Sequence, residues 1–288
     1  TDMTHPHSHE IKVRDGRLIA LNVLKYAILI VGAFIMIFPF LWMLLTSLKS
    51  LDEAIRIPPM WLPGAFRIEN YTHVWEMAPF MRYIFNTTVC CVLHVAGVVV
   101  FSVMGAYAFS MYEFKGKKVL FMLFLATMMV PGELLIIQNY ITINKLQLMD
   151  TFAAVVLPTF ASGFYTYMLR EHFLQIPPAL YKSAKVDGTS NWRFLWRVMV
   201  PMNKNTVATI AILSFIAQWN AFMWPNIVTQ TDKTRLVSSG LFVFRSEASS
   251  NLQYMMAGSC IIIFPMVIFY IIFRKRIING VGGGGIKG

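Results

Sequence analysis

Residues 21–48 read LNVLKYAILIVGAFIMIFPFLWMLLTSL, and this stretch decides the class of fold. After Lys25 it contains no charged residue. A helix needs about 20 consecutive apolar residues to cross the hydrocarbon core of a bilayer, because backbone polar groups find no water there and must bond within the helix. The stretch therefore predicts a membrane-spanning helix.

Further apolar segments of similar length follow along the chain. The six predicted spans are residues 21–48, 83–112, 119–143, 151–169, 205–228 and 254–273. All except the second contain a proline, and the second contains Gly97 and Gly105 instead. Proline removes a backbone donor and clashes with the preceding turn, so the proline-containing spans are expected to be kinked. The predicted fold is an all-α, polytopic membrane protein with six transmembrane helices, whose kinks suit either close packing or a path that opens and closes.

The composition supports this class and sets the orientation. Only 14% of the residues are charged, against about 25% in soluble domains. The formal net charge is +11, and the Lys and Arg residues gather before the first span and in residues 113–118, 170–204 and 274–288. Because basic loops stay in the cytoplasm, we expect cytoplasmic tails at 1–20 and 274–288, a six-helix domain at 21–273, and a cytoplasmic loop at 171–204. This distribution explains the basic charge without a nucleic-acid partner.

The sequence predicts no metal site and no cofactor. Its three cysteines all lie inside apolar segments, where the expected role is that of small hydrophobic side chains. The early His5, His7 and His9 lie in a polar tail that lacks the cysteine or carboxylate partners typical of a metal site.

The cytoplasmic loop predicts a pair of short helices. Pro177 and Pro178 can open the first helix, and the Asp187-Gly188 pair can end it, since glycine readily adopts positive φ. Thr189 or Ser190 can then cap a second helix that Pro201 ends. Its apolar side chains recur at helical spacing: Trp192, Leu195, Trp196 and Met199. This amphipathic helix-turn-helix suits insertion into a groove of another protein, or a position on lipid headgroups.

The same loop resembles a known motif. The residues from Ala184 to Gly188, with Pro201 downstream, resemble the EAA loop of binding-protein-dependent ABC importer permeases, whose pattern is Glu-Ala-Ala, two residues, Asp-Gly-Ala and a hydrophobic stretch ending in Pro. Lys182, at the position of the motif's glutamate, reverses a charge, so an ion pair made by that glutamate is not carried over. The resemblance implies that the loop docks into a cleft of an ATP-binding subunit. The predicted coupling residues are Lys182, Ser183, Ala184, Asp187, Gly188, Trp192, Leu195 and Pro201.

The resemblance extends over nearly the whole chain after residue 20. Its landmarks are Asn86-Thr87-Thr88, Gly105 to Phe109 with Phe114 to Lys117, Met129 to Glu133, Trp219-Asn220 with Trp224-Pro225, and the ending Asn279 to Gly288. They are similar to those of the smaller, maltose-permease-like subunit of carbohydrate importers in prokaryotic cell membranes. The resemblance implies as partners a second homologous permease subunit, two ATP-binding subunits and an extracytoplasmic solute-binding protein. It also implies that the C-terminal residues Asn279, Gly280, Lys287 and Gly288 contact the ATP-binding subunits.

Polar and aromatic side chains within the spans are candidates for a translocation path, or equally for hydrogen bonds between helices. They are Asn86, Glu133, Gln138, Asn139, Gln218, Trp219 and Asn220. The expected substrate is a sugar, with a related polar solute such as a polyol or glycerol phosphate as the alternative. Residues 49–82 and 229–253 are the expected docking surfaces for the external binding protein.

Two other functional classes have weaker support. A membrane enzyme would use His94 and Glu133 as an acid/base pair, but no HExxH or GxSxG motif accompanies them. A channel or secondary transporter would more often show further carboxylates inside the spans. The chain also has no GxxxxGK[ST] phosphate loop. We therefore expect a non-catalytic subunit whose ATP is hydrolysed on a separate chain.

Overall fold

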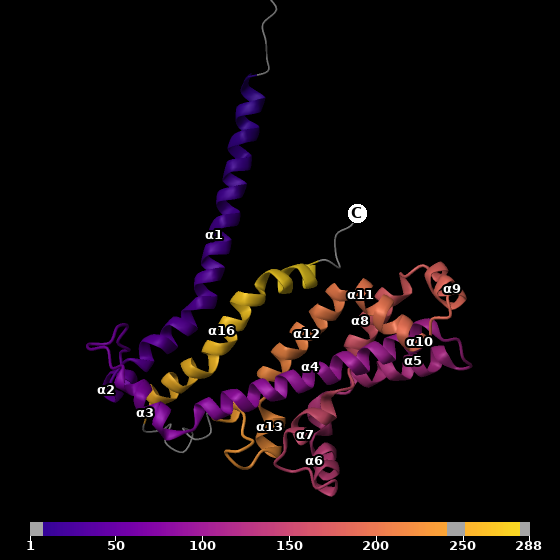
Figure 1. Cartoon of the computed structure of the whole chain (residues 1–288). Helices are drawn as coiled ribbons and strands as arrows, with labels where there is room; N and C mark the ends of the chain where they lie inside the picture. Colours follow the sequence, from indigo (N-terminus) through magenta and orange to yellow (C-terminus); the bar gives the residue numbers. More distant parts are fainter. Residues whose placement is uncertain (1–7, 241–250, 283–288) are drawn as a thin grey trace, which may run out of the picture. The chain divides into compact units, whose positions relative to one another are not determined.

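The computed structural model describes residues 8–240 and 251–282, and within them every regular element is helical (Figure 1). This confirms the predicted all-α class for the described residues. The chain divides into two compact units, residues 1–74 with 247–260 and residues 75–246 with 261–288. Each unit is described by itself.

The first unit contains α1 (Ser8–Ser47), α2 (Leu51–Ile55), most of α3 (Glu69–Met77) and the start of α16 (Leu252–Gly282). The buried Asn70 side chain donates hydrogen bonds to the carbonyl oxygens of Ser47 and Lys49, at 2.8 and 2.9 Å. The last carbonyl groups of a helix have no partners within the helix. These two bonds satisfy carbonyls at and just after the end of α1, and they hold α3 against that end.

Helix α4 (Phe80–Met111) is the centre of the second unit and packs against α8 (Gly163–Leu174) and α12 (Lys204–Trp219). Helices in a lipid environment associate through close van der Waals packing, which small residues permit. At Gly97 an added Cβ would lie 2.3 Å from the ring of Phe160, so only glycine allows this approach.

Two of the predicted spans are broken at a proline or within a few residues of one. The first consists of α5 (Lys117–Ala126) and η1 (Thr127–Met129), followed after Pro131 by η2 (Gly132–Leu135) and α6 (Ile136–Lys145), and its halves meet at 93°. The second, α7 (Phe152–Val156) with η3 (Leu157–Thr159) and α8, bends by 52°. Pro39 and Pro265 instead lie inside helices that continue through them. Kinking is therefore strongest where proline begins or enters a 3₁₀ turn.

In the described residues, the six predicted spans are not all continuous helices. Among residues 8–240 and 251–282, three helical segments are long and apolar enough to cross a membrane, namely Leu18–Ser47, Phe80–Met111 and Leu252–Lys275, and each bent pair adds one if it forms a single span. The expected continuous segment 205–228 is not continuous. Helix α12 ends at Trp219, and α13 (Met223–Val228) is a separate helix. Residues 220–222 interrupt the helix, which apolar composition alone does not reveal.

Candidate functional site

The first helix of the loop at residues 171–204 is α9 (Pro178–Val186), which ends in a hydrogen-bonded left-handed turn. Gly188 has φ of +70°, its N–H donates to the Lys185 carbonyl at 3.1 Å, and the Thr189 N–H donates to the Ala184 carbonyl at 2.9 Å. This pair of bonds is the Schellman arrangement, in which glycine is favoured because it has no Cβ. The prediction that Gly188 makes the turn is confirmed.

The second helix begins as predicted but ends differently. The Ser190 hydroxyl accepts a hydrogen bond from the Arg193 N–H at 3.3 Å and caps α10 (Asn191–Phe194). The helix then continues through a π-helical turn, η4 (Leu195–Met199), into α11 (Val200–Met202). The helix therefore ends at Met202, one residue beyond the predicted end at Pro201. A wider turn before a proline relieves the clash that its ring would make with the carbonyl four residues earlier.

The second helix packs into the core of the second unit. Its Phe194, Leu195 and Met199 side chains are at most 1% exposed. They join a cluster with buried side chains of α4, α8 and α12: Val98, Val103, Ala106, Tyr107, Leu169, Phe173 and Ile210. The sequence placed Trp192 and Leu195 on one apolar face, whereas the structure separates them. Trp192 is 60% exposed and accessible to a partner, while Leu195 lies within this chain's own core.

A short hydrogen-bond chain fixes α9 to the rest of the loop. The Tyr181 hydroxyl donates to Asn191 Oδ1 at 3.1 Å, and Asn191 Nδ2 donates to the Tyr112 hydroxyl at 3.0 Å, just beyond the end of α4. The Tyr181 ring also meets Phe194 edge to face, with centroids 5.2 Å apart. The sequence did not indicate Asn191, because an amide next to a cap residue carries no pattern of its own.

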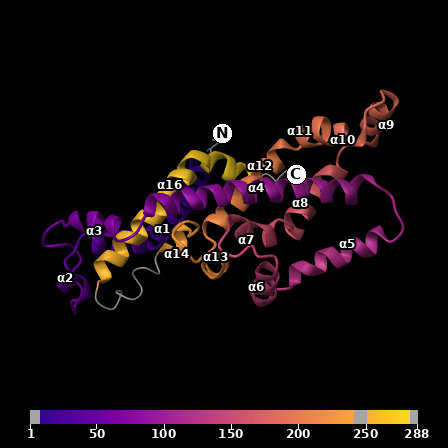
Figure 2. The same cartoon turned by 60° about the horizontal axis from the view of Figure 1, so that its bottom comes forward.

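The outer surface of α9 is open. Lys182, Ser183, Val186 and Asp187 are exposed, and Val186 is 88% exposed. Ala184 is half-buried against the core cluster described above. In both views α9 and α10 lie at the end of α4 where α5 begins (Figures 1 and 2). Helix α9 is exposed, whereas the helix that follows it is buried along one face. Another protein can therefore contact α9 and displace it.

The predicted C-terminal contact residues are only partly within the structure. Asn279 and Gly280 belong to the last part of α16, where the backbone alone is described. Lys287 and Gly288 lie outside the described residues.

The predicted path residues have different surroundings. Asn86 is buried, and its Nδ2 donates to the carbonyl oxygens of Lys233 and Arg235 at 3.1 and 2.9 Å. This amide therefore holds a loop in place. Gln218 is also buried, and its Nε2 has no hydrogen-bond partner among the described residues.

The other path candidates divide by exposure. Trp219 is buried and Asn139 half-buried, and the exposed members are Glu133, Gln138 and Asn220. His94 is buried, and its Nδ1 lies 3.0 Å from the Thr159 hydroxyl, so it has a structural hydrogen-bond partner.

The loop after α13 is held by Asp150, a residue that the sequence did not single out. Its carboxylate accepts hydrogen bonds from the N–H groups of Gln230 and Thr231 at 2.8 and 3.1 Å, and from the hydroxyls of Thr231, at 2.7 Å, and Thr234. Partial burial opposes ionisation, but these hydrogen bonds prevail and lower the pKa of Asp150 from 3.8 to about 2.

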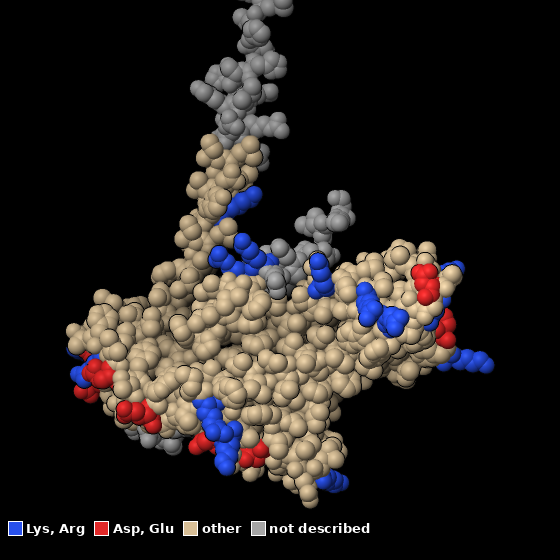
Figure 3. All heavy atoms as spheres, viewed as in Figure 1, with Lys and Arg blue, Asp and Glu red and all other residues tan. Residues whose placement is uncertain are grey.

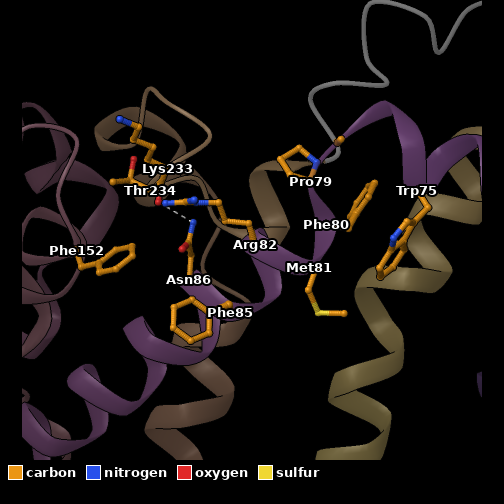
Figure 4. Close-up of a pocket in the computed structure, with 11 residues that line it drawn as sticks. Trp75, Pro79, Phe80, Met81, Arg82, Phe85, Asn86, Phe152, Lys233 and Thr234 are labelled. Atoms are coloured by element: carbon orange, nitrogen blue, oxygen red, sulfur yellow. Dashed lines mark hydrogen bonds between the residues drawn. The ribbon is translucent and has the colours of Figure 1, made fainter.

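A pocket of about 780 Å³ opens beside this loop at the start of α4. Trp75, Phe80 and Met81 form one part of its wall, and Arg82 points from α4 toward Lys233 and Thr234 (Figure 4). The pocket is thus mainly apolar, with its polar groups on the side of the loop.

Comparison with known proteins identifies the family. Residues 97–277 match the family described as the binding-protein-dependent transport system inner membrane component. The chain belongs to this family. The permease therefore is a multi-pass membrane component of a transport system, and the resemblance seen in its sequence is confirmed. Membership in a family of transport components favours this class over the membrane enzyme that His94 and Glu133 suggested.

Similar proteins carry related descriptions. The permease is 30% identical to the arabinooligosaccharides transport system permease protein AraQ of Halalkalibacterium halodurans, over 89% of this chain and 93% of the relative. It is 29% identical to the sn-glycerol-3-phosphate transport system permease protein UgpE of Rhizobium meliloti, over 90% and 95%. A chain of a bacterial ABC transporter involved in the import of the acidic polysaccharide alginate matches with a TM-score of 0.74 at 21% identity, over 95% of this chain and 99% of that one. This last likeness shows a shared fold.

Proposed function

We propose that this permease forms half of the translocation path of an ATP-driven importer and receives movement from an ATP-binding subunit through α9. The observation that carries the proposal is the contrast between the two short helices. Helix α9 exposes its outer residues, whereas the following helix buries Phe194, Leu195 and Met199 against α4, α8 and α12. A push on α9 would therefore reach the transmembrane helices as a rigid-body movement.

The proposal places the energy source on a separate chain, because this sequence contains no phosphate-binding loop. The family match supports the external solute-binding protein, a second permease subunit and two ATP-binding subunits as partners. The most apolar 18-residue window within Leu18–Ser47 of α1 contains no residue buried within this chain, which leaves its apolar surface for lipid or for the second permease subunit.

The proposed topology has six spans with both termini in the cytoplasm. The three long helical segments and two bent pairs supply five spans. Helix α12 has 16 residues, or about 24 Å of rise, which falls short of the roughly 30 Å hydrocarbon core. Helix α13 extends this segment and completes the sixth span. The positive charge of residues 113–118 and 170–204 supports a cytoplasmic position for the loops that contain them.

The proposed substrate is a sugar, carried past polar side chains of the broken helices. Gln218 is the best-supported path residue, because its buried Nε2 is left for a partner subunit or a solute hydroxyl. Glycerol phosphate is the second candidate, because relatives described for arabinooligosaccharides and for sn-glycerol-3-phosphate are 30% and 29% identical to the chain. Competition of each solute for uptake in reconstituted vesicles separates the two.

The function is tested by purifying the permease from its native membrane, identifying the chains that accompany it and reconstituting them in vesicles. ATP hydrolysis should rise when the loaded external binding protein is added, and Trp192→Ala should weaken that response without loss of the permease from the membrane. Hydrolysis by the permease alone, or hydrolysis that ignores every accompanying binding protein, would contradict the proposal. The second result would favour a channel.

A further inference from the structure

A second pocket, of about 600 Å³, lies where α4 ends and α5 begins. Its lining includes three cations, Lys117, Lys118 and Arg170, against one carboxylate, Glu113. Figure 3 shows Lys and Arg side chains, with Asp and Glu side chains among them, at the end of the second unit that carries α5, α9 and α10. Glu113 pairs with Lys117, and Glu171, outside the lining, pairs with Arg170, so Lys118 carries the excess positive charge of the pocket.

Arg170 and Lys117 are held facing this pocket. Arg170 Nε donates to the Phe109 carbonyl at 3.0 Å, its Nη1 lies 2.7 Å from Glu171, and its guanidinium lies 4.3 Å above the ring of Phe121. Lys117 is paired with Glu113 at 2.9 Å, and its side chain is only 14% exposed. Fixed cations lose little conformational entropy when an anion binds to them.

Other donors remain free. Within the described part of the chain, Arg170 Nη2 and Lys118 Nζ have no hydrogen-bond partner. The first backbone N–H groups of α5 are further donors. The cap residue Gly116 provides no side-chain oxygen to accept from them, and the first turn contains no acidic residue. The first N–H groups of a helix attract negative charge, so this backbone supports the same preference as the side chains.

The surroundings of the pocket are apolar as well as basic. Phe114 and Val119 line it and are 42% and 57% exposed. Leu120, Met122 and Leu123 continue the exposed apolar surface along α5, at 52%, 64% and 59%. A small soluble anion would make no use of this surface, whereas acyl chains would cover it.

We propose that this pocket binds the headgroup phosphate of an anionic phospholipid, with the acyl chains lying along α5. Basic pockets between transmembrane helices suit such headgroups, and the proposed topology places this one at the cytoplasmic leaflet. The lipid would bridge the end of α4, the start of α5 and the C-terminal half of α8. It would thereby stabilise α4 and α8, against which the second helix of the loop packs.

The test uses the purified, delipidated full chain and a fluorescent phosphatidylglycerol, with phosphatidylcholine as the uncharged counterpart. Lys118→Gln should weaken phosphatidylglycerol binding about fivefold, the effect of one cation at a membrane surface. Lys118→Arg should keep it. Lys115→Gln is the matched control, because it removes the same charge from the same exposed turn without lining the pocket. Circular dichroism checks that the variants remain folded.

Three outcomes would overturn the proposal. Equal binding of phosphatidylcholine would show that charge is not recognised. Equal losses for Lys115→Gln and Lys118→Gln would show a diffuse surface attraction. Displacement of the lipid by millimolar inorganic phosphate would show a site for a soluble anion instead.

Discussion

The turn at Gly188 offers the sharpest test of the coupling mechanism. Its φ of +70° is a conformation that costs an ordinary L-residue about 1–2 kcal/mol, and a β-branched side chain is especially unsuited to it. A Cβ built at this position meets nothing within 4 Å. Gly188→Val therefore perturbs the backbone without creating a clash, which makes the expected effect a property of the turn alone.

A cost of about 1–2 kcal/mol lowers the population of the native turn about 5- to 30-fold relative to its alternatives. If α9 must be in its native position to dock, the apparent affinity for the ATP-binding subunit should fall by up to the same factor, and by the full factor once the alternatives dominate. The six proposed spans form their backbone hydrogen bonds without this turn, so membrane abundance should stay near normal.

The assay titrates the co-purified ATP-binding subunit onto the wild-type permease, Gly188→Val and Gly188→Asn in detergent, and compares uptake in vesicles. Asparagine adopts the left-handed conformation more readily than other side chains, so Gly188→Asn should bind and transport much better than Gly188→Val. Normal binding and transport by Gly188→Val would refute the reasoning, and α9 would then be an anchor on lipid headgroups. Equal defects in both variants would show that the handedness of the turn is not what matters.

Three further predictions concern the structure around this site. Asn191→Ala should weaken coupling, because each lost neutral hydrogen bond is worth about 0.5–1.5 kcal/mol, and a double-mutant cycle with Tyr112→Phe should give a non-zero coupling energy in ATPase-subunit binding. Leu195→Ala should lower stability by about 2–5 kcal/mol in thermal unfolding, whereas the exposed Trp192→Ala should change it by less than about 0.5 kcal/mol while reducing ATPase-subunit binding. The lowered pKa of Asp150 means that its carboxylate stabilises the fold above pH about 4 and that this contribution is lost as the pH falls toward 2. Asp150→Asn, which tolerates the positive φ of 60° at this position, should therefore be less stable than wild type at neutral pH and match it near pH 2.

Local chemistry accounts for much of what the sequence predicted correctly. The Gly188 turn follows from glycine's freedom at positive φ, and the Ser190 cap from a hydroxyl placed to accept an N–H. The sharp break at Pro131 follows from the loss of a donor. Each of these depends on one residue and its immediate neighbours, so the sequence contains the whole cause.

Features that depend on distant neighbours were harder to predict. Helical spacing grouped Trp192 with Leu195, but burial depends on which side of the helix meets α4 and α8, and the sequence does not state this. The bonds between Asp150 and the loop after α13 join residues about 80 positions apart. The passage of the helix through Pro201 depends on the π-helical turn before it, whose single extra residue per turn leaves no clear periodic signal.

These long-range contacts also decide how movement can pass through the loop. Helix α9 is joined to the second helix by the covalent turn at Gly188 and, independently, by the hydrogen bond from Tyr181 to Asn191. Asn191 in turn bonds Tyr112, next to the end of α4, so α9 has a link to the central helix that bypasses the turn. A hinge at Gly188 alone would let α9 swing without moving the membrane domain. With the second link in place, a displacement of α9 would be transmitted to α4 as well as to the buried helix, which is the rigidity that the proposed coupling role requires.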